Sequence, residues 1–202
     1  DRLRSRGLGD VYKRQVYDYD TLKQRLRETA FLTKGLRIVL TDTREESHHC
    51  HEFHYAGGIK EFVTYLNRSK EALYPDVIYC EGNRDGVYVE VAMQHNDSYN
   101  DATYSFVNNI ITPEGGTHLA GFRNALTKTF NTYARANKIL KDSEPALTGD
   151  DIREGLTAII SIKIEEPQFE GQTKQKLGNS EARGAVAVSY THLRAHETGA
   201  YL

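Results

Sequence analysis

The residues best suited to chemistry lie in segment 167–181, which combines Lys174, Lys176 and two glycines with almost no apolar side chains. A lysine on a glycine-flanked loop is well placed to reach an anionic group, because the loop tip is exposed while its two ends are anchored. The segment therefore predicts an anion-binding loop. The alternative interpretation is an ordinary solvated surface loop, where most lysines lie.

A second set of candidate ligands consists of His48, His49, Cys50, His51 and His54. Imidazole and thiolate are preferred ligands of zinc and similar metals. Adjacent residues of an extended segment point to opposite faces, however, and no second cluster follows at zinc-like spacing. We therefore expect no native metal site here.

A loop of this kind needs a rigid element before it, and the apolar run 156–164 predicts a buried strand. Further strands are expected at 36–41, 77–80, 87–95 and 103–107. Residues 77–80 and 87–95 flank the turn Asn83–Gly86 and should form an antiparallel hairpin. The strand 103–107 should pair beside 87–95, which makes one sheet.

The spacing of apolar residues predicts helices at 20–35, at 58–67 and from His118 past Tyr133. Asp20 is expected to cap the first helix and Gly35 to end it. Thr148 or Asp150 can cap a short helix whose first turn carries Asp150 and Asp151. These carboxylates are interpreted as capping groups rather than catalytic ones.

Composition limits the classes of protein to consider. The 202 residues are 39% hydrophobic and 27% charged, which is typical of a soluble globular protein. A net charge of -2 gives no general electrostatic case for nucleic acid, so a DNA contact must come from a local basic patch. Only Cys50 and Cys80 are present, and no membrane-spanning run or secretory signal is visible, so we expect a cytoplasmic protein without a membrane partner.

Several motifs resemble one known family. Residues 172–181 (QTKQKLGNSE) are similar to the nucleotide-sensing loop of DNA gyrase B and its topoisomerase IV relatives, the ATPase subunits of type IIA DNA topoisomerases. Residues 147–156 (LTGDDIREGL), 108–110 (NNI) and 114–123 (EGGTHLAGFR) are similar to the same family in the same order. The resemblance extends from residue 16 to residue 187.

The resemblance implies an α+β fold. The family's transducer domain is of the ribosomal protein S5 domain 2 type, a mixed sheet with helices packed on one face, and we expect it at residues 46–186. Residues 16–45 would be the last helix and strand of a GHKL-type ATP-binding domain. After Asn179 or Ser180 the family begins another helix, which we expect to end near Val186 in this chain. Residues 1–15 and 187–202 fit neither their neighbours nor the family, so we expect non-native, disordered sequence; genuine variable termini are the alternative.

The resemblance also assigns roles to three residues. Lys174 would be catalytic, contacting the γ-phosphate of ATP, and Gln172 would add a neutral hydrogen bond to it. Arg123 lies off the apolar stripe of its helix and is either a solvated cation or, by resemblance, a DNA-binding residue that lines the cavity for a duplex. ATP and Mg2+ would be cofactors of the complete subunit, with the magnesium ligands outside this chain.

By resemblance, the chain couples ATP binding and hydrolysis to DNA gate closure, strand passage and supercoiling, and is inactive alone. Its partners would be a DNA duplex, the DNA gyrase A protein in a heterotetramer, and a second copy of the complete ATPase region. The alternatives are the ATPase subunit of topoisomerase IV, a passive nucleic-acid-binding module of S5-like fold, and a metal-binding protein that uses residues 48–54. A passive binder has no need for the Gln172–Lys174 loop and should have a basic surface.

Overall fold

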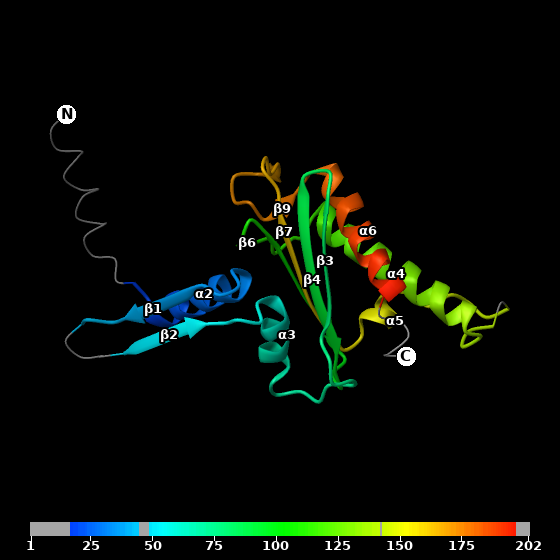
Figure 1. The fold of residues 1–202 in the computed structure, drawn as a ribbon, viewed down its shortest axis with the longest axis horizontal. Coiled ribbons are helices and arrows are strands. Elements are labelled where there is room, and N and C mark those ends of the chain that lie inside the picture. The colour runs from blue at the N-terminus through cyan, green and yellow to red at the C-terminus, as the bar shows by residue number, and fades with distance from the viewer. Residues whose placement is uncertain (1–16, 45–48, 142, 197–202) are drawn as a thin grey trace.

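The computed structural model describes residues 17–44, 49–141 and 143–196, and the expectation of disorder at residues 1–15 falls outside these ranges. Figure 1 shows a sheet at the centre of the molecule, an arm of one helix and two strands on one side, and a long helix projecting on the other. Within the described ranges, no helix combines the length and apolar character that a bilayer crossing requires.

The central sheet contains β3 (Ile78–Arg84), β4 (Val87–His95), β5 (Ala102–Val107), β6 (Ile110–Ile111) and β7 (Leu156–Lys163). The strand order is β3-β4-β7-β5-β6, with β7 antiparallel to β4 and parallel to β5. The prediction that 103–107 pairs beside 87–95 is therefore wrong, because β7 lies between these strands. β7 takes the central place because its residues 156–162 are buried, as expected of a near-continuous apolar strand with a neighbour on each side.

Two hairpin turns of the sheet use left-handed backbone. Asp85 and Gly86 have φ of 53° and 77° in the two-residue turn that joins β3 to β4, so the expected hairpin is confirmed. Asn108 and Asn109, with φ of 48° and 66°, form the corresponding turn between β5 and β6. Asparagine and aspartate tolerate this conformation better than most side chains do.

Helices cover both faces of the sheet; they are α2 (Tyr19–Leu32), α3 (Ile59–Asn67), α4 (Thr117–Ala136), α5 (Gly149–Arg153) and α6 (Ser180–His196). α4 and α6 pack on one face, where Leu126 and Ile160 are fully buried. α3 and the end of α2 pack on the other face, where Phe31 and Phe62 stack over Ile159. The expected α+β class with a mixed sheet is confirmed, but the helices are not confined to one face, because β7 and its neighbours are apolar on both.

The arm consists of α2 and the antiparallel pair β1 (Arg37–Thr41) and β2 (Cys50–His54). The N-cap of α2 is Asp18 rather than Asp20: the Asp18 carboxylate accepts a hydrogen bond from the backbone N–H of Thr21 at 2.7 Å. Asp20 instead lies in the first turn, where a negative charge is also favourable. The β1–β2 pair crosses the expected domain boundary between residues 45 and 46.

Two other predicted helix limits can be compared with the structure. Thr148 caps α5 in a capping box with Asp151, so the interpretation of Asp151 as a capping group is confirmed. The prediction that the last helix stops near Val186 is wrong, since α6 continues to His196. Residues 197–202 lie outside the described ranges.

Candidate functional site

The predicted anion-binding loop is a short hairpin beyond the end of β7. Its strands are β8 (Phe169–Glu170) and β9 (Lys176–Leu177), and its tip, residues 171–175, is exposed throughout. Lys174 has a positive φ of 55°, and its Nζ lies 5.9 Å from the centre of the Phe169 ring. Among the described residues, no carboxylate forms an ion pair with Lys174, so its ammonium is open to an external anion.

The neighbouring lysine is in a different state. Lys176 Nζ lies 3.0 Å from Glu170 Oε2 across the β8–β9 pair. This ion pair joins the two strands of the hairpin and matches the charge of Lys176. Lys174 and Lys176 are therefore a natural pair for comparison, since only one of them has its charge matched within the loop.

The base of the loop is fixed to the start of α4. Leu177 is fully buried, and its backbone N–H donates to the carbonyl of Gly115 at 3.0 Å. Gly116 and Leu177 form a parallel bridge, and the N–H of Glu114 donates to the carbonyl of Gln175 at 3.1 Å. An exposed tip on an anchored base is the geometry that the sequence predicted for this loop.

Asn179 is a positioning residue that the sequence did not reveal. Its Oδ1 accepts from the Gln168 N–H at 2.6 Å, and its Nδ2 donates to the Glu166 carbonyl at 3.2 Å. Nδ2 also donates to Glu181 Oε1 at 2.7 Å, which holds the pKa of the Glu181 carboxyl below its usual range. The Asn179 side chain, which is 4% exposed, thus joins the start of the hairpin to its end. This role depends on contacts between segments and is not visible in the local sequence.

Arg123 belongs to a separate part of the molecule. Its Nη2 lies 3.3 Å from Asp101 Oδ2, and Arg153 Nε lies 3.2 Å from the same oxygen. Asp101 precedes β5, which pairs with the start of β7, whereas the Lys174 loop follows the end of β7. The structure therefore brings Lys174 and Gln172 into one loop but does not bring Arg123 to them.

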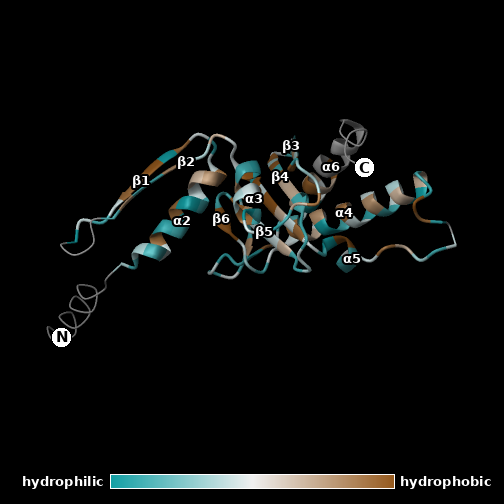
Figure 2. Cartoon of the chain, turned by 90° about the horizontal axis from the view of Figure 1, so that it is seen from below, coloured by the Kyte–Doolittle hydropathy of each residue, from teal (hydrophilic) through white to brown (hydrophobic). Residues whose placement is uncertain are grey.

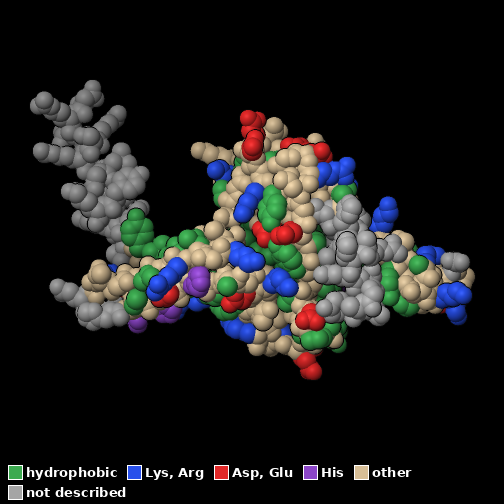
Figure 3. Space-filling model, viewed as in Figure 1, with side chains coloured by type: hydrophobic (Ala, Val, Ile, Leu, Met, Phe, Trp, Pro, Cys, Tyr) green, Lys and Arg blue, Asp and Glu red, His purple; other side chains and the backbone are tan. Residues whose placement is uncertain are grey.

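Arg123 is partly available to a ligand. Its side chain is 41% exposed, although its Nε is buried and has no partner among the described residues. On the face shown in Figure 3, lysine and arginine side chains are interspersed with acidic ones.

The histidine-rich strand does not assemble a metal centre within the described residues, which exclude His48. No group of three or more His, Cys, Asp or Glu side chains there could hold a metal ion. His51 Nδ1 is instead 3.0 Å from the hydroxyl of Tyr19 on α2, and Cys50 Sγ is 3.6 Å from Thr41 Oγ1. These contacts connect the arm's own elements.

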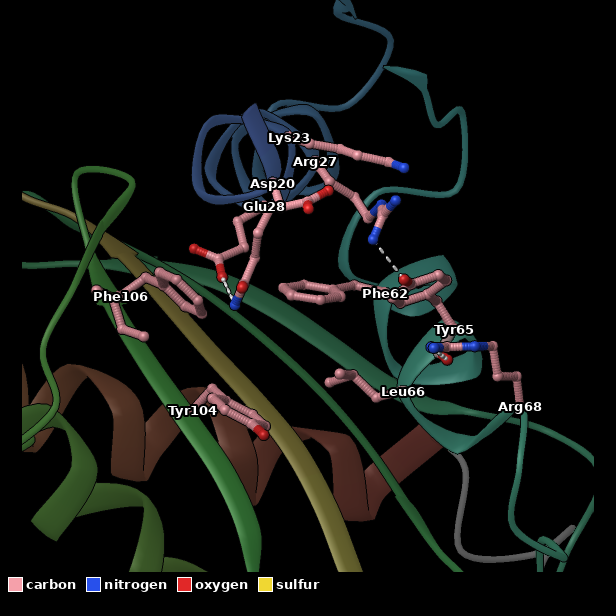
Figure 4. Close-up of a pocket in the computed structure, with 12 residues that line it drawn as sticks. Asp20, Lys23, Arg27, Glu28, Phe62, Tyr65, Leu66, Arg68, Tyr104 and Phe106 are labelled. Carbon is pink, nitrogen blue, oxygen red and sulfur yellow. Dashed lines mark hydrogen bonds between the residues drawn. The ribbon is translucent and has the colours of Figure 1, made fainter. Parts of the chain in front are cut away.

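A cleft of about 450 Å3 separates α2 from α3 and β5. Figure 4 shows Lys23, Arg27 and Glu28 of α2 on one side of it, and Tyr65 and Tyr104 among the residues that face them. One contact across it is a hydrogen bond from Arg27 Nη1 to the Tyr65 hydroxyl at 2.6 Å. Neither Lys174 nor Arg123 lines this cleft.

Comparison with known sequences gives one consistent result. The family model described as DNA gyrase B matches residues 58–196, which includes part of the segment expected to be non-native. The DNA gyrase B protein of Halalkalibacterium halodurans is 59% identical over 184 residues, covering 91% of this chain and 29% of that protein. Its counterpart from Clostridium acetobutylicum is 57% identical over 178 residues, covering 88% and 28%. The chain thus spans less than a third of the length of these curated relatives.

Comparison with solved structures gives the same family. The 43K ATPase domain of Thermus thermophilus gyrase B, in complex with an aminocoumarin, matches with a TM-score of 0.81 and 35% identity, covering 94% of this chain and 51% of that one. The topoisomerase IV ATP binding domain of Francisella tularensis matches with a TM-score of 0.71 and 28% identity, covering 89% and 47%. With a family model matched over more than half of its length and relatives above 50% identity, the chain belongs to the DNA gyrase B family.

Proposed function

We propose that this chain is the nucleotide-sensing part of the ATP-hydrolysing subunit of a type IIA DNA topoisomerase, most similar to DNA gyrase. The observation that carries the proposal is Lys174, whose exposed ammonium has no ion pair among the described residues while the base of its loop is anchored. Such a group can bind a phosphate without first breaking a salt bridge. Residues 16–45 would end an ATP-binding domain and residues 46–186 would form the transducer domain.

In the complete subunit, Lys174 would contact the terminal phosphate of ATP as a point charge, and Gln172 would donate a hydrogen bond to it. A fixed cation beside a transferred phosphoryl group stabilises the charge that develops in the transition state. The residues present fit this part of the site, because the loop exposes an amide and an ammonium that forms no ion pair within the described ranges. We place the remaining contacts to ATP, and the ligands of Mg2+, in the rest of the subunit.

Loss of the terminal phosphate would remove both contacts and release the loop. The cleft lies between α2, in the first proposed domain, and the central sheet, in the second, so a rotation of one domain against the other would change its width. We assign to this rotation the coupling of ATP hydrolysis to closure of a DNA gate and strand passage. Such a rotation would have to move α2 against the stacked Phe31 and Phe62 rings and the Asn109–Thr33 hydrogen bond.

The proposed partners are a DNA duplex, the DNA gyrase A protein and a second copy of the complete subunit, in the cytoplasm. Arg123 would contact DNA phosphates through its exposed face, and such contacts are independent of sequence and sensitive to salt. The ATPase subunit of topoisomerase IV is the second candidate, favoured by the structural match to the Francisella tularensis domain. The higher identities to gyrase proteins place it second.

The test is ATP hydrolysis by a complete gyrase B protein in which this chain replaces the corresponding segment. Lys174→Ala should lower kcat by roughly a hundredfold or more, because it removes a preorganised charge from the transition state. Lys176→Ala is the matched control and should leave turnover unchanged, since Lys176 already pairs with Glu170. Unchanged turnover in a folded Lys174→Ala protein would show that the loop is only structural.

A further inference from the structure

The Asn108–Asn109 turn lies where the strand that leads to the Lys174 loop leaves the sheet. Its backbone is anchored there, because the N–H of Asn108 donates to the carbonyl of Ile162 in β7 at 2.9 Å. Both asparagines have positive φ. The turn therefore has a fixed backbone and two side chains directed by it.

The Asn108 side chain lengthens the pairing between β5 and β7. Its Nδ2 donates to the Ile164 carbonyl at 2.8 Å, and the Ile164 N–H donates to its Oδ1 at 3.0 Å. These two bonds imitate a backbone pair just beyond the end of β7 at Lys163. Asn108 thereby sets the direction in which the chain leaves the sheet.

Only residues 165–168 separate Ile164 from β8. Asn179 holds the far end of this connection through the N–H of Gln168 and the carbonyl of Glu166. Two asparagine side chains therefore fix the path from β7 to the hairpin that carries Lys174. If either is lost, residues 165–168 and β8 can shift, although β9 stays bonded to residues 114–116 and the core strands stay in place.

The second residue of the turn contacts the arm. Asn109 Nδ2 donates to Thr33 Oγ1 at 3.1 Å, and Thr33 is the C-cap of α2. The Asn109 Oδ1 is buried and has no hydrogen-bond partner among the described residues. This two-residue turn thus contacts both the end of β7 and the end of α2, and Asn109 and Thr33 are 76 residues apart along the chain.

We propose that Asn108 is a positioning residue for the phosphate contact of Lys174, and that Asn109 connects the position of this loop to α2. Asn108 acts through the Ile164 backbone, and touches neither nucleotide nor Lys174. The inference rests on the proposed function of Lys174. It extends that function by giving the loop a mechanical connection to the ATP-binding side of the molecule.

A double-mutant cycle in the complete gyrase B protein carrying this chain tests the positioning role proposed for Asn108. Asn108→Gly keeps the left-handed backbone accessible but removes the side chain. It should lower kcat for ATP hydrolysis about tenfold, the order of effect expected when a catalytic group is slightly misplaced. In a Lys174→Ala background the same substitution should cause no further loss, because the group it positions is already gone.

The matched control is Asp85→Gly, which introduces glycine into the equivalent turn between β3 and β4 and should leave kcat unchanged. A loss from Asn108→Gly that is equally large with and without Lys174, or no loss at all, would overturn the positioning role. Full turnover in the Lys174→Ala protein would overturn the proposed function itself, so the two failures are distinguishable within one set of proteins.

Hydrogen exchange in the same complete protein tests the proposed connection between Asn109 and α2. A non-hydrolysable ATP analogue should slow amide exchange in the last turn of α2 in the parent protein, and Asn109→Gly should abolish that change. An unaltered response of α2 in Asn109→Gly would show that the contact with Thr33 does not carry the connection. Asp85→Gly again serves as the control and should retain the response.

Discussion

His118 is an imidazole buried in the core of the protein, with no ion pair to any residue that the structure describes. It is 0% exposed at the start of α4, with Nε2 3.2 Å from Thr112 Oγ1 and Nδ1 without a hydrogen-bond partner among the described residues. Burial lowers the pKa of His118 to about 4, since an imidazolium there would be desolvated. The folded protein therefore holds this histidine neutral.

This arrangement predicts acid sensitivity with a defined sign. The unfolded chain binds the proton near the ordinary pKa of 6.5 and the folded chain only near 4, so protonation favours unfolding. The contribution to stability is complete above pH 6.5 and is lost as the pH falls towards 4, up to about 3 kcal/mol. Urea unfolding at pH 7 and pH 4.5 should show a larger loss in the parent chain than in His118→Gln. Equal losses would contradict the assignment.

Individual residues differ in how far the sequence alone can predict them. The exposure of Lys174 was predictable from a polar, glycine-flanked segment, whereas the roles of Lys174 and Gln172 were assigned only through the resemblance to the gyrase B family. The roles of Asn108 and Asn179 depend on hydrogen bonds to the backbone of residues up to 56 positions away, which no local pattern records. Asp101 was missed for the same reason, since its two arginine partners come from α4 and α5.

The contact between β9 and the start of α4 shows how two elements fix the position of a loop. A Cβ on Gly116 would lie 2.3 Å from the carbonyl oxygen of Leu177, and Gly116 has a φ of 133°. The two backbones can therefore approach only because this residue has no side chain. This close approach of the two backbones fixes the position of β9.

Gly116→Ala should consequently destabilise the chain by about 3 kcal/mol, combining backbone strain with a steric clash. Gly86→Ala is the control: Gly86 also has a positive φ, but nothing lies within 4 Å of a Cβ there, so the cost should be about 1 kcal/mol. Chemical denaturation of both variants measures the difference. Similar costs would mean that backbone conformation alone requires glycine at position 116.

The elements themselves were easier to predict than their arrangement. Periodicity and turn residues located β4, β7, α3 and α4 because these signals lie within one segment. The order of the strands was missed because β7 follows β4 by more than sixty residues and inserts between β4 and β5. The apolar run 156–162 indicates a central strand, but it does not identify the strands that pair with it.

Across the described part of the chain, the five-stranded sheet and the β1–β2 sheet differ in how well they are supported. β7 has a neighbour on each side and buried residues along almost its whole length, whereas β1 and β2 pair only with each other. Figure 2 shows hydrophobic residues along β1, and Val39 on that strand is 54% exposed. A two-stranded sheet with unpaired edges and an exposed apolar side chain is marginally stable by itself.

Amide hydrogen exchange should therefore divide the chain into two regions. Amides of β4 and β7 should exchange only through global unfolding, while those of β1 and β2 should exchange through local opening in the chain studied alone. In a complete gyrase B protein that contains this chain, the same β1 and β2 amides should become protected if residues 16–45 belong to a larger ATP-binding domain. Equal protection of β1 and β7 in the chain alone would mean that α2 is enough to stabilise the arm. If protection of β1 and β2 did not rise in the complete protein, the proposed domain division would be contradicted.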